Sequence, residues 1–214
     1  MARIDDPPSG VGSLDALAWQ RDGRHVIGIT RPTAPHDGPT RWIELDTVTR
    51  RWQLLRPTGP TVGSAVCDDG RHAATIDQAG LRRVTNVDTG QVETTFTWQA
   101  TAGADWPSEL TWLPDCQALL ATDLSTGVSG APEGGTVTRI DLRTHTWRSV
   151  LTADTEVSEV STSCDGAYVY AIAWNVDGIQ LVRVPIGGGP PTVLLDDNRA
   201  RWLGGVNHLE GCAA

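Results

Sequence analysis

Six side chains in segments with loop character have the chemistry to form a binding or reactive site. His36 beside Asp37 pairs an imidazole with a carboxylate, and Trp106 offers an aromatic anchor of the kind that dominates protein interfaces. The candidate binding residues are His36, Asp37, Asp105, Trp106, Glu133 and Arg199. A simpler interpretation exists for each pattern, since such a Trp often covers the rim of a core and a His–Asp pair in a loop is usually solvated. We expect binding from this set and assign no catalytic residue.

Motifs for covalent or metal-assisted catalysis are incomplete in this sequence. Gly127-Val128-Ser129-Gly130 is one residue short of a nucleophile elbow, and all 17 basic residues are Arg, which excludes a lysine Schiff base and a P-loop. Asp196-Asp197-Asn198 offers oxygen ligands for calcium but lacks the spacing of an EF-hand loop. A turn held by Asx hydrogen bonds is the simpler interpretation of that segment. We therefore predict neither a cofactor nor a metal.

Charge and hydropathy narrow the range of partners. A net charge of −9 and an isoelectric point near 4.9 argue against nucleic acid as the main partner. No apolar run reaches the roughly eighteen residues that a membrane helix needs, so we expect no membrane insertion. The first residues lack the apolar segment of a secretory signal. The compartment stays open, being cytoplasmic if Met1 is the natural start and extracytoplasmic if the chain is a fragment of a secreted protein.

Four cysteines recur at nearly equal intervals. Cys67, Cys116, Cys164 and Cys212 are separated by 49, 48 and 48 residues. No pair has the two-residue spacing of a zinc knuckle, so a structural zinc site is not expected. Four buried thiols and two disulfide bridges are both open, and the sequence does not choose among the three pairings of four cysteines.

A turn motif repeats with the same period as the cysteines. Asp22-Gly23 returns after 47, 46, 50 and 45 residues as Asp69-Gly70, Asp115-Cys116, Asp165-Gly166 and Glu210-Gly211. Asp-Gly between apolar segments is a strong hairpin signal, and we predict type I′ turns with left-handed backbone at these positions. The Asp residues are expected to bond to their own turns.

Short segments of strand character surround each turn, four to a unit. In the third unit they cover 109–113, 118–124, 136–142 and 147–152, and no helical period interrupts them. The second strand of the fourth unit is apolar on both faces, where Tyr168, Tyr170 and Trp174 alternate with smaller residues such as Ala171 and Ala173. A sheet packed between two similar sheets needs this pattern, because neither of its faces meets water.

The turns and strands resemble WD-repeat-like and TolB-like β-propeller repeats. That family carries a Ser-Pro-Asp-Gly turn followed by an apolar strand. The turns here read Gln20-Arg21-Asp22-Gly23, Cys67-Asp68-Asp69-Gly70, Leu113-Pro114-Asp115-Cys116 and Ser163-Cys164-Asp165-Gly166. The resemblance spans residues 13 to about 197. It implies an all-β propeller of about four four-stranded antiparallel blades and implies little about chemistry, since propellers host many functions.

The expected domain order is an extension, four blades and a short remainder. We place the extension at 1–12 and the blades at about 13–58, 61–99, 108–153 and 155–197, within 13–201. Residues 202–214 are then the start of a fifth blade or a ring-closing strand. Four blades are few for a propeller. We favour an incomplete or truncated larger propeller over a closed ring, which leaves self-association open as a way to complete it.

The function that follows is recognition rather than catalysis. We expect the tight turns to lie at one end of the blades and the longer loops, with the six candidate residues, at the other. The leading interpretation is a non-catalytic binding or scaffold module that recognises a protein or peptide through its long-loop face. The alternative is a propeller that gates a prolyl-oligopeptidase-like hydrolase, or a propeller enzyme acting at its central channel.

Overall fold

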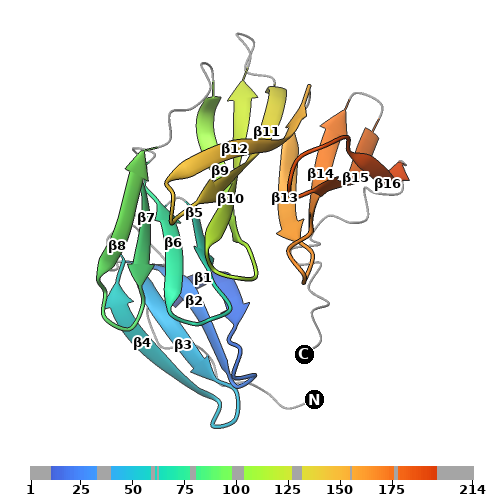
Figure 1. Cartoon of the computed structure of the whole chain (residues 1–214). Coiled ribbons are helices and arrows are strands. Elements are labelled where there is room, and N and C mark those ends of the chain that lie inside the picture. Colours follow the sequence, from blue (N-terminus) through green and yellow to red (C-terminus); the bar gives the residue numbers. More distant parts are fainter. Residues whose placement is uncertain are drawn as a thin grey trace. The chain divides into compact units, whose positions relative to one another are not determined.

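The computed structural model describes residues 11–32, 40–58, 61, 63–77, 81–97, 104–126, 132–154, 156–175 and 178–196. These residues form four four-stranded antiparallel sheets in which the strands follow one another in chain order (Figure 1). The predicted fold class, an all-β propeller of four four-stranded blades, is confirmed. The chain divides into two compact units, Met1–Trp98 and Gln99–Ala214, and each holds two blades.

The first unit contains blades one and two. Blade one consists of β1 (Val11–Trp19), β2 (His25–Pro32), β3 (Arg41–Asp46) and β4 (Arg51–Pro57). Blade two consists of β5 (Gly63–Val66), β6 (His72–Ile76), β7 (Leu81–Asn86) and β8 (Val92–Thr97). Ile29 and Trp42 on one face of blade one pack with Val66 and Ala73 of blade two. Large side chains of one sheet thus fill the space over small side chains of the next.

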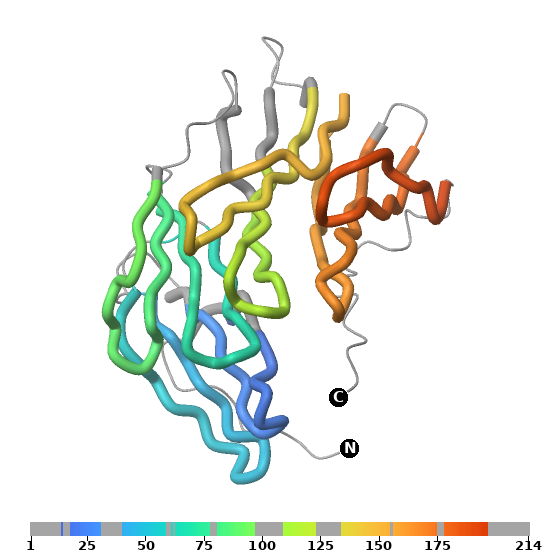
Figure 2. The backbone as a smooth tube through the Cα atoms, viewed as in Figure 1, coloured from blue at the N-terminus to red at the C-terminus, as the bar shows by residue number. Residues whose placement is uncertain are grey.

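The second unit contains blades three and four. Blade three consists of β9 (Ala104–Trp112), β10 (Ala118–Thr126), β11 (Pro132–Asp141) and β12 (Thr146–Ala153). Blade four consists of β13 (Val157–Thr162), β14 (Tyr168–Asn175), β15 (Gly178–Pro185) and β16 (Thr192–Asp196). The tube trace of each blade runs back and forth as a meander before the chain enters the next one (Figure 2).

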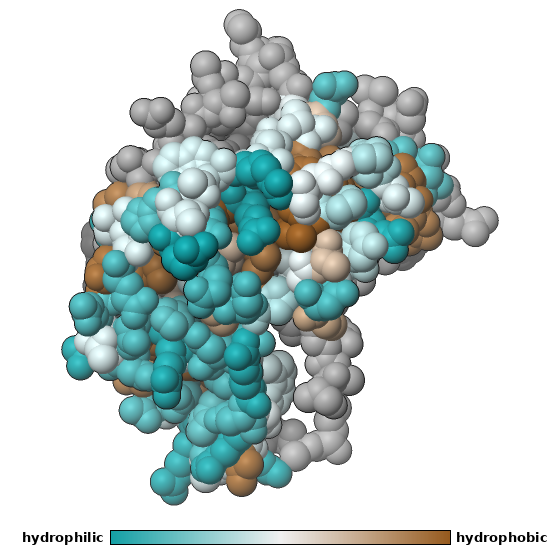
Figure 3. Space-filling view, viewed as in Figure 1, coloured by the Kyte–Doolittle hydropathy of each residue, from teal (hydrophilic) through white to brown (hydrophobic). Residues whose placement is uncertain are grey.

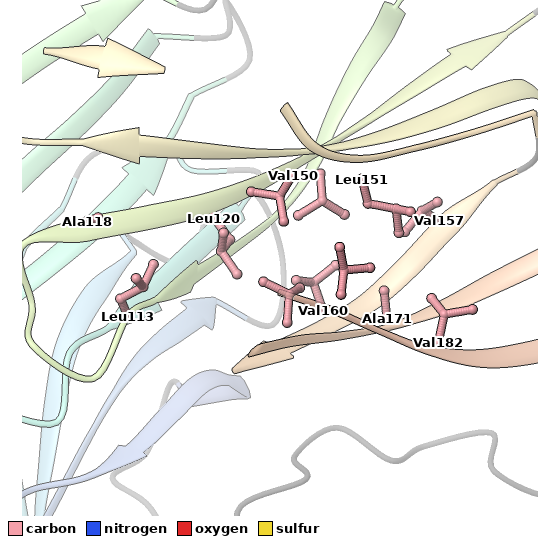
Figure 4. Packing of buried hydrophobic residues seen from close by; sticks show 12 residues of the cluster. Leu113, Ala118, Leu120, Val150, Leu151, Val157, Val160, Ala171 and Val182 are labelled. Atoms are coloured by element: carbon pink, nitrogen blue, oxygen red, sulfur yellow. The ribbon is translucent and has the colours of Figure 1, made fainter. Parts of the chain in front are cut away.

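A continuous apolar core joins blades three and four. Leu120 and Val150 of blade three point toward Val160 and Ala171 of blade four (Figure 4). Leu120 has no exposed surface, as expected for a residue enclosed between two sheets. The burial of these aliphatic side chains is the main force that stabilises the pair of blades.

The turns between first and second strands share one conformation. Gly23, Gly70, Cys116 and Gly166 have φ values of 63°, 72°, 55° and 67°. The preceding Asp residues are not left-handed, so the prediction of type I′ turns, which need positive φ at both central residues, is wrong. The Gly23 N–H instead donates to the Gln20 carbonyl, which closes a right-handed turn before the left-handed residue.

Blade three extends further than the sequence predicts. The structure begins β9 at Ala104 rather than at residue 109, and β11 at Pro132 rather than at residue 136. Both additions pair with β10, which itself continues to Thr126. Pro107 lies on an edge strand and beside a register shift, where a missing N–H is tolerated. The part of the chain that the structure describes has no helix with the length and apolar character of a membrane span.

Candidate functional site

The repeated Asp residues at the tight turns hold their own backbone. Asp22 Oδ1 accepts hydrogen bonds from the N–H groups of Arg24 and His25, at 2.8 and 2.9 Å. Asp69 accepts the same pair of bonds in blade two, while Asp115 and Asp165 accept the first of them in blades three and four. The expectation that these carboxylates bond to their own turns is confirmed. They are structural residues at the tight-turn end of each blade.

Two histidines extend this turn motif. His25 Nδ1 lies 2.5 Å from Asp22 Oδ2, and His72 Nδ1 lies 2.5 Å from Asp69 Oδ2. The hydrogen bond to Asp22 raises the pKa of His25, and the same bond lowers the pKa of Asp22 to about 2. His72 also places Nε2 3.3 Å from Glu93. The His–Asp pair recurs at the same position of two blades. We therefore assign it to stabilisation of the turn.

A shallow pocket of about 460 Å³ opens on blade one beside His25. The charged side chains at its wall are His25, Glu44, Asp46 and Arg51. Arg24 binds the Asp46 carboxylate through two nitrogens and holds its pKa far below the usual range. The pocket therefore has walls of mixed charge, to which Trp52 adds an aromatic side chain. Figure 3 shows a mostly hydrophilic surface over this part of blade one.

Three glutamates interact across blades three and four, with Glu109 on β9, Glu159 on β13 and Glu156 directly before β13. Glu109 on β9 accepts a hydrogen bond from the Val160 N–H at 3.3 Å. Burial raises the pKa of Glu109, and the nearby Glu159 and Glu156 carboxylates raise it further. Glu159 sits at a register shift of β13 with a φ of 51°, where the strand bends. The sequence does not predict the partial burial of Glu109, because the neighbouring blade contributes to it.

The residues predicted to form the binding site fall into two groups. His36, Asp37 and Arg199 lie outside the described residues. Asp105 and Trp106 are placed at the start of β9, and Glu133 at the start of β11. The ladder brings these backbones together, because Trp106 pairs with Leu124, and the neighbouring Ser125 pairs with Gly134, the residue that follows Glu133. Three of the six positions therefore lie on strand ends of one blade rather than in loops.

Arg82 on β7 is a buried cation that sequence reasoning missed. It has no exposed surface, whereas its neighbour Arg83 forms a 3.0 Å ion pair with Asp77. The adjacent arginines Arg82 and Arg83 give only a weak signal that one of them is buried. Strand alternation places the two side chains on opposite faces of the sheet, but it does not say which face is buried.

The cysteines of the described segments are oxidised. Cys67, Cys116 and Cys164 are each disulfide-bonded, and none of them is a free thiol. Of the two states left open by the sequence, the structure contains bridges rather than buried thiols.

Comparisons with known proteins identify the fold. TolB from Acinetobacter baumannii is similar with a TM-score of 0.62 and 15% identity, over 86% of this chain and 43% of that chain. An oligogalacturonate lyase in complex with manganese is similar with a TM-score of 0.63 and 15% identity, over 88% of this chain and 55% of that chain. The oligogalacturonate lyase of Vibrio parahaemolyticus is similar with a TM-score of 0.67 and 11% identity, over 90% of this chain and 56% of that chain.

These similarities establish a β-propeller fold and nothing finer. No family model matches the chain, and no curated protein matches it by sequence. The chain spans about half the length of the solved structures that it resembles.

Proposed function

We propose that this chain is a non-catalytic propeller module of the WD-repeat-like and TolB-like kind that recognises a protein or peptide. In this proposal the partner binds at the long-loop end of the blades, which is the end opposite the Asp turns. Rigid sheets that present variable connections at one end are a common architecture for recognition. The disulfide-bonded cysteines support an oxidising, extracytoplasmic setting for that recognition.

One observation carries the proposal, namely the division of polar groups between the two ends of the blades. At the tight-turn end the Asp carboxylates are occupied by hydrogen bonds within their own turns. At the other end, strand pairing in blade three gathers the backbones of Asp105, Trp106 and Glu133. An aromatic residue flanked by carboxylates suits a partner with apolar and basic side chains.

A peptide-display selection against the full chain tests the proposal. A random peptide library supplies the probe, and we expect enriched peptides that contain apolar and basic residues. Trp106→Ala and Arg199→Ala should each weaken their binding about tenfold, the loss expected for an interface anchor. Trp147→Ala is the matched control, because Trp147 lies beside the turn at the opposite end of blade three and is exposed.

Two results would overturn the proposal. One is a selection without enrichment beyond an unrelated propeller used as bait. The other is enriched peptides whose affinity is unchanged by Trp106→Ala and reduced by Trp147→Ala. Circular dichroism of each variant verifies that lost binding does not reflect lost folding.

A second candidate function is an enzyme acting at the first strands, or the propeller of a larger hydrolase. The observation that favours it is the raised pKa of Glu109 beside Glu156 and Glu159, since a carboxyl group with a raised pKa is better suited to act as a general acid. Two of the similar structures are lyases that act on oligogalacturonate by name. Turnover of oligogalacturonate that disappears in Glu109→Gln would support this candidate, and absence of turnover by the wild-type chain would count against it.

A further inference from the structure

The first strand of blade four contains a β-bulge where it meets blade three. The ladder between β13 and β14 shifts register between Ser158 and Ser161, so that Glu159 and Val160 together oppose one residue of β14. Glu159 has a φ of 51°, in the left-handed region that residues other than glycine seldom adopt. A conformation of this kind persists where surrounding contacts hold it in place. We therefore expect neighbouring side chains to fix the bulge.

Two side chains of β9 bind the backbone of this bulge. Glu109 Oε2 accepts a hydrogen bond from the Val160 N–H at 3.3 Å, and Thr111 Oγ1 donates one to the Val160 carbonyl at 2.8 Å. Glu109 and Thr111 are two residues apart and so lie on the same face of their strand. The Val160 side chain is buried in the core between the two blades (Figure 4). We call Glu109 and Thr111 the clamp, because together they attach the bulge of blade four to blade three.

The clamp holds one carboxyl group in an unfavourable electrostatic setting. Burial raises the pKa of Glu109, and two carboxylates of the adjacent blade, those of Glu159 and Glu156, raise it further. Hydrogen bonds from the backbone of Val160 and Glu159 lower the pKa, but they do not outweigh burial and repulsion. The ionised form of Glu109 is therefore less favourable in the folded chain than in the unfolded chain.

We propose that Glu109 makes the attachment of blade four to blade three proton-sensitive, with a tight clamp when its carboxyl group is neutral and a weaker clamp when it is ionised. Protonation adds one proton to a carboxylate oxygen and removes the repulsion from Glu156 and Glu159. The carbonyl oxygen that remains still accepts the hydrogen bond from Val160. The proposal concerns the stability of the contact, so it depends neither on the partner that the module recognises nor on any turnover at Glu109.

The direction of the pH dependence follows from the raised pKa. The stabilisation by neutral Glu109 is complete below the unfolded value of 4.5 and is lost as the pH rises through the folded pKa. Asp141 and Asp165 in the same unit have lowered pKa values because of hydrogen bonds within their own turns, so their contributions are lost as the pH falls. The contribution of Glu109 must therefore be measured locally and as a difference between variants.

Hydrogen exchange of the full chain at about pH 4.5 and about pH 8, corrected for intrinsic exchange rates, measures this difference. Glu109→Gln keeps an acceptor oxygen and cannot ionise. This variant should raise the protection of β13 amides several-fold at the higher pH and have a smaller effect at the lower pH, where wild-type Glu109 is largely neutral. Asp154→Asn is the matched control, because Asp154 is an exposed carboxylate of the same unit, and it should leave β13 unchanged.

The other half of the clamp serves as a comparison that does not titrate. Thr111→Val removes the bond to the Val160 carbonyl and should lower the protection of β13 by the same factor at both pH values, with β6 of the first unit unchanged. Unchanged β13 exchange in this variant would contradict the clamp.

Two further results would overturn the proton sensitivity of the clamp. One is an effect of Glu109→Gln on β13 that is equal at the two pH values or is a loss of protection at the higher one. The other comes from the wild-type chain alone, and is a carbon-13 titration of the Glu109 carboxyl group with a midpoint at or below 4.5.

Discussion

At the residue scale, carboxylate side chains have different roles at different positions of the repeat. Asp22 and Asp69 accept hydrogen bonds from the backbone of their own turns and contact the Nδ1 atom of a histidine. Their position in the repeat therefore determines their structural role. Glu109 has a raised pKa because it is buried near two other carboxylates. The roles of the turn aspartates could be predicted from the sequence, because the Asx turn is a local structure. The burial of Glu109 could not, because it depends on the adjacent blade.

The His25–Asp22 pair should make stability depend on pH in a defined direction. The raised pKa of His25 means that its contribution is complete below its unfolded value of 6.5 and is lost as the pH rises through the folded pKa. The lowered pKa of Asp22 means that its contribution is complete above 3.8 and is lost as the pH falls toward about 2. The pair therefore contributes most between about pH 4 and 6.5.

Urea unfolding across pH 3 to 9 measures this contribution. The difference in free energy of unfolding between wild type and His25→Asn should be largest within that interval and should shrink on both sides. His145→Asn is the control, because His145 occupies another exposed turn of left-handed backbone that Asn tolerates. A difference that stays constant with pH would show that the His25–Asp22 pair does not stabilise the fold.

At the scale of elements, strands and turns differ in how well local sequence determines them. Apolar alternation and the Asp-Gly repeat predict the meander of each blade, because both are short-range signals. The type of turn is decided by backbone hydrogen bonds such as that of Gly23 N–H to the Gln20 carbonyl. The length of β9 is decided by its ladder with β10, so that Pro107 is included in a strand despite its low strand propensity.

The core between blades three and four should carry much of the stability of the second unit. Leu120→Ala removes a fully buried side chain from that core and should lower the free energy of unfolding by about 2 to 5 kcal/mol. Leu194→Ala, at an exposed position of β16, is the matched control and should change it by less than about 0.5 kcal/mol. Equal effects of the two substitutions in chemical denaturation would contradict the assignment of this core.

At the scale of the whole molecule, the repeated unit determines the fold, and the connections between strands determine the binding surface. The chain matches propellers over most of its own length but covers about half of theirs. The architecture could be predicted because each repeat carries the same local signals. The partner could not, since binding at the long-loop end depends on side chains that come from segments with no repeating pattern.

The most direct test of this account is a hydrogen-exchange footprint of a selected peptide on the full, unreduced chain. We expect slower exchange at residues 104–107 and 124–135, where the candidate residues of blade three lie, and unchanged exchange at the turns around Asp22 and Asp69. Protection that is confined to those turns, with residues 104–107 and 124–135 unaffected, would contradict it.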